Sequence, residues 1–164
     1  MTALPMLVLC VGMEAYGLQK YGDRHGEFGR TTAVSPERLQ HYVAVELAAG
    51  LILFFGGAKL TQVVSTGFNF FPTYTDCFRL VVYVYSPHYW FRMVDGLPAV
   101  NTWICWGAGA LCAMYLLYHG VALALRPDIT KGFGLYILMT LVLVMLSGIT
   151  HLLAVATLLG KLAI

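Results

Sequence analysis

Hydrophobic and polar positions are arranged in long blocks along this chain. The two longest apolar blocks, residues 103–125 and 132–159, contain no Asp, Glu, Lys or Arg, and a short polar segment, residues 126–131, separates them. A helix of about 20 apolar residues, rising about 1.5 Å per residue, crosses the hydrocarbon core of a bilayer. Proline cannot continue a helix, so Pro127 ends the first block. The pattern predicts an antiparallel hairpin of two transmembrane helices.

Three earlier apolar blocks predict three further spans. The five expected spans cover residues 2–18, 42–58, 77–91, 103–125 and 132–159 of a single domain, 1–164. The expected fold is therefore all-α, a polytopic membrane helix bundle of about five transmembrane helices. Ser35 before Pro36 is a helix-start signal for the second helix. Pro87 is expected to kink or end the third span, so that Arg92 falls in the turn after it.

Two polar connectors separate the first three spans. Residues 19–40 mix charges of both signs, whereas residues 59–76 are rich in aromatic side chains and are expected at the headgroup layer. The third span carries a second aromatic group, Tyr83, Tyr85, Tyr89 and Trp90. We interpret it as an aromatic belt at the bilayer surface, with a quinone or sterol platform as the alternative.

Composition supports a membrane protein. The chain is 59% hydrophobic and only 11% charged, its mean hydropathy is +0.75, and soluble proteins carry roughly a quarter charged residues. The net charge of +2 and the lack of a basic patch argue against nucleic acid as a partner. The expected partners are the lipid bilayer and other membrane proteins, or further copies in an oligomer. The expected location is the bacterial inner membrane, and the distribution of Lys and Arg does not fix the orientation.

The sequence carries no recognisable catalytic motif. It has no Gly-rich phosphate loop, no Ser-His-Asp order and no paired metal motif. Its four cysteines form no CxxC pair, so a zinc or disulfide framework is not expected. The sequence thus makes no positive case for an enzyme, and neither a metal nor a cofactor is expected, although a haem or a pigment stays an open alternative.

Two acidic residues fall inside predicted spans. Glu14 lies about one turn before the end of the first span and Glu46 about one turn into the second. On antiparallel neighbours they lie at a similar depth, and two close carboxylates cannot both ionise cheaply, so they would hold a proton or a cation. The alternative is that each pairs at the interface with a headgroup, or with Lys20, Arg38 or His41.

Two histidines fall inside the last two spans. His119 and His151 invite a haem or metal interpretation because a neutral imidazole is a common metal ligand. On antiparallel helices rising about 1.5 Å per residue, however, their depths differ by roughly 18 Å, so they cannot share one site. His151 is expected at the level of Cys105 and Trp106. A structural hydrogen bond between helices is the alternative role for either histidine.

The order of several short motifs resembles the Yip family of membrane proteins. The matching features are Gly56-Gly57 after the second span, Leu80-Val81-Val82-Tyr83 with Ser86-Pro87, Leu97-Pro98, Tyr115 to Gly120, and the elbow with Pro127 followed by Lys131-Gly132-Phe133. Yip proteins are five-span membrane proteins named for their interaction with Ypt/Rab GTPases, and bacteria carry divergent members. The resemblance implies a non-catalytic protein that organises membrane or partner proteins. The alternative is a small transporter, or an accessory subunit of a membrane redox or transport complex, that uses an intramembrane Glu or His.

Small residues suggest where the last two spans meet. Gly109, Cys112 and Gly120 on the fourth span, and Gly134 and Gly148 on the fifth, would let two backbones approach closely in lipid. We therefore expect a tight glycine-bearing contact between these two spans.

Overall fold

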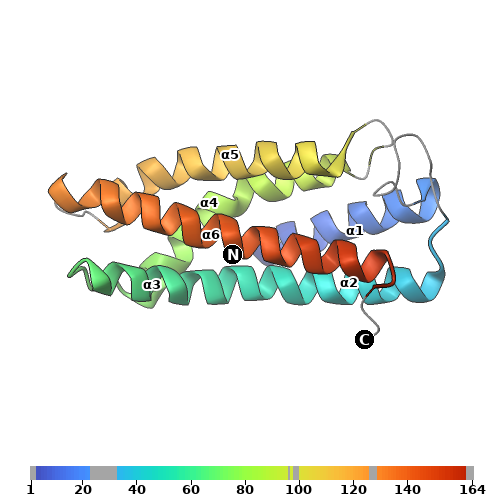
Figure 1. Ribbon diagram of the computed structural model, residues 1–164, viewed down its shortest axis with the longest axis horizontal. Helices are drawn as coiled ribbons and strands as arrows, with labels where there is room; N and C mark the ends of the chain where they lie inside the picture. The colour runs from blue at the N-terminus through green and yellow to red at the C-terminus, as the bar shows by residue number, and fades with distance from the viewer. Residues whose placement is uncertain (1–2, 23–32, 96, 98–99, 126–128, 162–164) are drawn as a thin grey trace.

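The chain folds into a bundle of long helices (Figure 1). The computed structural model describes residues 3–22, 33–95, 97, 100–125 and 129–161, and all regular structure in them is helical. Their helical segments are α1 (Ala3–Tyr21), the continuous helix α2 (Pro36–Leu51), η1 (Ile52–Gly56) and α3 (Gly57–Gly67), then α4 (Tyr74–Asp95), α5 (Thr102–Gly120) with η2 (Val121–Leu125), and α6 (Ile129–Leu158). The predicted all-α helix bundle is confirmed.

The helices lie roughly along one long axis and alternate in direction (Figure 1). We call the end where α1 finishes and α2 begins the α1–α2 end, and the opposite end the α3–α4 end. The helix α2–η1–α3 and helix α5 form opposite edges in this view, and α6 crosses between them in front of α4. Helix α1 covers only the half of the bundle towards the α1–α2 end.

Three of these helices are long and apolar enough to cross a membrane. They are Pro36–Gly67, Thr102–Leu125 and Lys131–Leu158. Helices α1 and α4 fall outside this set. Helix α4 carries charges along its length, including Asp76, Arg79 and Arg92, which lowers its hydropathy. The outer faces of α5 and α6 expose large apolar side chains such as Leu111 and Met145, as expected for surfaces that contact lipid.

The second helix begins as predicted but ends later. Ser35 caps it, with its Oγ accepting a hydrogen bond from the Arg38 amide at 3.4 Å. The expected connector over residues 59–76 is wrong, because helix α3 continues to Gly67 and only residues 68–73 connect it to α4. Small buried residues explain the continuation: Thr61 and Ser65 lie against the core, and the Ser65 hydroxyl donates to the Thr61 carbonyl at 2.8 Å.

The Gly56-Gly57 pair lies at the junction of a π-helical turn with α3. A π-helical turn contains about one residue more than an α-helical turn. The consecutive side chains Leu53 and Phe54 therefore both point into the core. A Cβ on Gly57 would lie 3.4 Å from both Val81 on α4 and Leu143 on α6. These are ordinary van der Waals distances, and they place Gly57 where α3, α4 and α6 meet.

Helix α4 continues through Pro87, so the expectation that this proline ends the third span is wrong. The Ser86 hydroxyl donates to the Val82 carbonyl at 2.8 Å, one turn back. In Figure 1 the helix passes behind α6, from beside α3 to beside α5. Its continuation to Asp95 places Arg92 in the core and not in a turn.

The aromatic belt predicted on the third span is half right. Tyr83 and Trp90 are exposed, but Tyr85 and Tyr89 are buried. The Tyr85 hydroxyl donates to the Leu143 carbonyl at 2.6 Å, and the Tyr89 ring centroid lies 5.3 Å from that of Phe54. A spacing of four residues places Tyr85 and Tyr89 on the same inner face of the helix.

The predicted glycine contact between α5 and α6 is wrong on the α5 side, where Gly109 and Gly120 face α4, whereas Gly148 on α6 faces Trp106 of α5 at an ordinary distance of 3.7 Å. A Cβ on Gly109 would lie 2.9 Å from the His88 Cα, and one on Gly120 would lie 2.5 Å from Leu80 Cδ1. On α6, Gly134 faces Phe68 and Gly148 faces Trp106. The close approach that small residues permit is therefore between α4 and α5.

The predicted elbow is shorter than expected, because α6 begins at Ile129. The rest of the elbow, including Pro127, lies outside the described residues, as does Pro98 of the Leu97-Pro98 motif. The four cysteines are free thiols, and Cys10, Cys77 and Cys105 are buried.

Candidate functional site: a buried ion cluster of Glu14, Glu46 and Arg92

Three charged side chains from three helices meet inside the bundle. Glu14 on α1 and Glu46 on α2 are each 3% exposed, and Arg92 on α4 is 8% exposed. Arg92 Nε lies 2.8 Å from Glu14 Oε1, and Arg92 Nη2 donates to Glu14 Oε2 at 3.0 Å and to Glu46 Oε1. A single guanidinium therefore pairs with two carboxylates. We call these three residues the ion cluster.

The pattern of each helix places these charges on its buried face. The buried residues are Leu7, Cys10, Val11 and Glu14 on α1, and Tyr42, Glu46, Ala49 and Gly50 on α2. In both sets the charged residue follows the spacing of three and four that defines one helix face. On α4, Arg92 lies three residues after Tyr89 and four after His88, which are both buried. The helices thus carry the charges inward together with their apolar side chains.

The two carboxylates differ in their surroundings. Glu14 accepts a hydrogen bond from the Tyr42 hydroxyl at 2.9 Å and a weaker one from the Cys10 thiol at 3.8 Å, in addition to its two contacts with Arg92. In the described part of the chain, the hydrogen bond and ion pair of Glu46 are made with Arg92. Donors therefore surround Glu14 on both oxygens, whereas Glu46 depends on Arg92.

The charges of the ion cluster do not cancel when both carboxylates are ionised. Two carboxylates and one guanidinium then give these three side chains a sum of one negative charge, and buried charge inside an apolar bundle is costly. A single proton or monovalent cation would neutralise the cluster. The arrangement can therefore bind and release one positive charge.

A small cavity adjoins the ion cluster on the side of Glu46. Its polar lining includes Glu46, Arg92 and His88, together with Ser147 and Thr150 from α6, whereas Glu14 does not line it. His88 is 2% exposed, and its Nδ1 has no hydrogen-bond partner among the described residues. A buried polar atom without a partner is costly and needs an explanation, and the residue that carries it lines a cavity.

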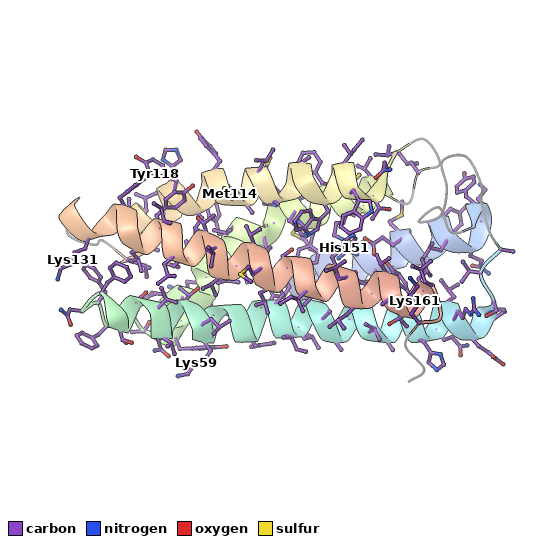
Figure 2. All side chains as sticks on the ribbon, in the orientation of Figure 1. Lys59, Met114, Tyr118, Lys131, His151 and Lys161 are labelled. Atoms are coloured by element: carbon purple, nitrogen blue, oxygen red, sulfur yellow. The ribbon has the colours of Figure 1, made fainter. Side chains whose placement is uncertain are left out.

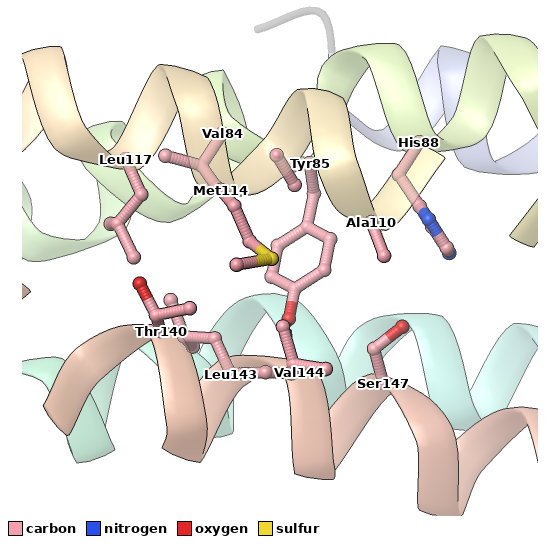
Figure 3. Close-up of a pocket in the computed structure, with 11 residues that line it drawn as sticks. Val84, Tyr85, His88, Ala110, Met114, Leu117, Thr140, Leu143, Val144 and Ser147 are labelled. Carbon is pink, nitrogen blue, oxygen red and sulfur yellow. Dashed lines mark hydrogen bonds between the residues drawn. The ribbon is translucent and has the colours of Figure 1, made fainter. Parts of the chain in front are cut away.

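A second small cavity lies between α4, α5 and α6 and shares His88 and Ser147 with the first. Figure 3 shows His88 and Ser147 facing each other at one end of it, and Thr140 near Leu117 at the other. Thr140 Oγ1 also has no hydrogen-bond partner in the described residues. The rest of the lining is mostly apolar.

The structure brings Glu14 and Glu46 together, as the sequence predicted from their depths. The structure adds a cationic partner that the sequence did not predict: in the described part of the chain, Arg92 pairs with both carboxylates, whereas Lys20 donates to the Tyr16 hydroxyl at 3.2 Å. The sequence pattern does not reveal Arg92 as a site residue, because Pro87 predicts a kink or a helix end before it. The spacing of Tyr85, Tyr89 and Arg92 was the signal that could have revealed it.

The two predicted histidines lie away from each other. His151 is buried beside two tryptophans, with ring centroids 5.0 Å from Trp103 and 6.3 Å from Trp106, so its predicted level beside Trp106 is confirmed. His119 is exposed, with the rings of Tyr115 and Tyr118 at 4.8 and 5.3 Å. Figure 2 shows Tyr118, the neighbour of His119, and His151 in opposite halves of the bundle.

No group of three or more His, Cys, Asp or Glu residues in the described part of the chain is arranged to hold a metal ion. Comparison of the chain with protein-family models, with curated proteins and with solved structures found no match.

Proposed function

We propose that this chain is a small membrane transporter, or the proton-binding subunit of a larger transport complex, that takes up and releases a proton at the ion cluster. The observation that carries the proposal is the pairing of two buried carboxyl groups, Glu14 and Glu46, with the single guanidinium of Arg92 beside a cavity. Charged groups at membrane depth typically mark ion or proton pathways. The proposal includes five membrane spans and a location in the bacterial inner membrane, as the sequence predicts.

Glu46 is the carboxyl group that holds the proton in this proposal. Its contact with Arg92 involves Oε1, and it lines the cavity. The donors around Glu14 favour an ionised carboxylate there. With Glu46 protonated the cluster is neutral, and after the proton leaves, Arg92 is shared between two carboxylates. Proton binding thereby changes how strongly α2 is tied to α1 and α4.

Proton flux into proteoliposomes tests this function. Purified protein is reconstituted with an internal pH-sensitive dye, and a proton gradient is imposed across the membrane. The chain should dissipate the gradient, and Glu46→Gln should abolish the flux. Glu37→Gln is the matched control because Glu37 is exposed on the first turn of the same helix. A native protein that conducts no better than empty vesicles would contradict transport by this chain.

A second candidate is the Yip-like role of a non-catalytic protein that organises membrane or partner proteins. Two contacts between residues of the Yip-like motifs favour this role. Gly57 lies against Val81, and Gly120 lies against Leu80. Co-purification from native membranes followed by mass spectrometry tests it. An organising protein should retain its partners in the Glu46→Gln variant and show no proton flux in either form.

A further inference from the structure

We infer that His88 is the group through which the ion cluster exchanges its proton with the second cavity, an inference that rests on the proposed function. His88 belongs to neither of the charged pairs and was not among the residues that the sequence singled out. Among the described residues, His88 is the titratable residue that lines both cavities. A proton that leaves Glu46 through the first cavity therefore meets His88 before it can reach the second.

The chemistry of the side chain suits this role. A neutral imidazole carries a proton on one ring nitrogen and a lone pair on the other. It can accept the proton of Glu46 at one nitrogen while the other nitrogen releases its proton to a water molecule hydrogen-bonded to Ser147, which leaves the opposite tautomer and conserves the charge of the ring. Return of the ring to its first tautomer completes the cycle. A purely structural buried histidine would be hydrogen-bonded, whereas the Nδ1 of His88 has no such partner in the described residues.

Residues of α5 and of its own helix, α4, surround the imidazole of His88. On α5, Gly109 leaves room for it, because a Cβ there would lie 2.7 Å from His88 Nδ1. On α4, the rings of Tyr85 and Tyr89 stand edge-on to it, with centroids 5.9 and 6.0 Å away. Any larger residue at position 109 would displace His88. The position of the His88 imidazole therefore depends on Gly109 of α5.

Charged and titratable groups face His88 from the surrounding helices. Arg92 lies one turn along its own helix, Glu46 on α2 and Cys10 on α1 line the first cavity with it, and His151 approaches from α6. Ser147 lies in the lining of both cavities and can hydrogen-bond to water there. A small polar cavity holds water when several polar groups surround it, so a water molecule can bridge Glu46 and His88.

Hydrogen–deuterium exchange of the protonated carboxyl group tests the route without measuring transport. The full chain in proteoliposomes is transferred to deuterium oxide, and the carbonyl stretch of a protonated carboxylic acid is followed by infrared spectroscopy. The native chain should show this band, and Glu46→Gln should remove it. His88→Leu should slow its isotope shift by about 100-fold, at the lower end of the contribution of a positioned proton-transfer group.

Two further variants control for misfolding and for the general effect of replacing a histidine. His88→Gln retains hydrogen-bonding atoms but lacks the two nitrogens of the imidazole, so it should slow exchange as well. It keeps the test decisive if His88→Leu does not fold. His119→Leu is the control, because His119 is exposed and lines neither cavity, and it should exchange at the native rate. Native exchange in a folded His88 variant would overturn the relay and leave the proposed function standing. Absence of the carboxylic-acid band in the native chain would overturn both.

Discussion

At the scale of single residues, Arg92 is the centre of the ion cluster. It binds Glu14 through two nitrogens and Glu46 through one, and all three side chains are buried. A buried pair of this kind is weak evidence for net stability, but removal of one partner leaves uncompensated charge in the core. The cluster is therefore sensitive to loss of the cation and less sensitive to loss of a carboxylate that already holds a proton.

Loss of Arg92 should be the most damaging single change in the cluster. Arg92→Ala removes the guanidinium from the buried, ionised Glu14 carboxylate, which costs about 3–5 kcal/mol. Arg79→Ala on the exposed face of the same helix should cost less than about 0.5 kcal/mol. Thermal unfolding of the detergent-purified proteins compares the two. Equal melting temperatures would mean that Arg92 does not support the fold.

Arg92→Lys should recover only part of the lost stability. A lysine ammonium cannot present the rigid fork of donors that a guanidinium offers to two carboxylates. Its melting temperature should therefore lie between those of Arg92→Ala and the native chain. A fully native value would show that charge alone, without the fork geometry, holds the three helices together.

Tyr42 should contribute through its hydroxyl group. Tyr42→Phe keeps the buried ring but removes the 2.9 Å hydrogen bond to Glu14. A hydrogen bond to a charged group contributes about 1.5–3 kcal/mol, so the variant should unfold at a lower temperature. Tyr16→Phe on the exposed face of α1 is the control. A loss of stability equal in both variants would contradict this role.

At the scale of helices, α4 is the element around which the others pack. Its Arg92 binds Glu14 and Glu46. Its Tyr85 hydroxyl donates to the Leu143 carbonyl on α6. Its His88 lies against Gly109 on α5. The apolar pattern of the sequence underestimates the length of α4, because the charged residues and the proline inside it are typical of a helix end. Its central position follows from contacts that are distant in sequence.

The glycines of α5 and α6 should differ in their tolerance of a side chain. Gly109→Ala would place a Cβ 2.9 Å from the backbone of His88, and overpacking of this kind costs about 1–3 kcal/mol. Gly148→Ala would meet Trp106 at 3.7 Å, an ordinary contact, and gains about 1 kcal/mol of helix propensity. Melting temperatures should fall for the first and stay level or rise for the second. The opposite order would place the tight contact between α5 and α6.

Sequence reasoning recovered the parts of the fold that depend on local pattern. The existence of the helices, the Ser35 cap and the common depth of Glu14 and Glu46 all follow from spacing along the chain. The partner of each glycine does not, because it depends on how each helix is rotated about its axis in the bundle. Arg92 and His88 were missed for a related reason: their role became visible only once α4 continued through Pro87.

At the scale of the whole molecule, the buried charges lie towards one end of an otherwise apolar bundle. The cluster joins α1, α2 and α4 near the α1–α2 end. The first cavity adjoins it between α1, α2, α4 and α6, and the second lies between α4, α5 and α6. Exposed apolar side chains on α5 and α6 face outward. A buried ion cluster inside an apolar surface is the arrangement that the proposed function needs.

The five-span topology should be visible by labelling in intact membranes. After replacement of the native cysteines, Gln40→Cys at the α1–α2 end and Thr66→Cys at the α3–α4 end are both exposed positions. A membrane-impermeant thiol reagent should reach them from opposite sides, whereas Leu116→Cys and Val142→Cys should be shielded. Labelling of positions 40 and 66 from the same side would contradict a spanning second helix.

The stability of two carboxamide variants tests the central claim most directly. If Glu46 holds the proton, Glu46→Gln replaces a neutral acid with a neutral side chain of the same shape and should change the unfolding free energy by less than about 1 kcal/mol at neutral pH. Glu14→Gln removes the ionised partner of Arg92 and should cost about 3–5 kcal/mol. The account predicts this asymmetry in unfolding measurements of the purified chain. Equal losses in the two variants, or a larger loss for Glu46→Gln, would contradict it.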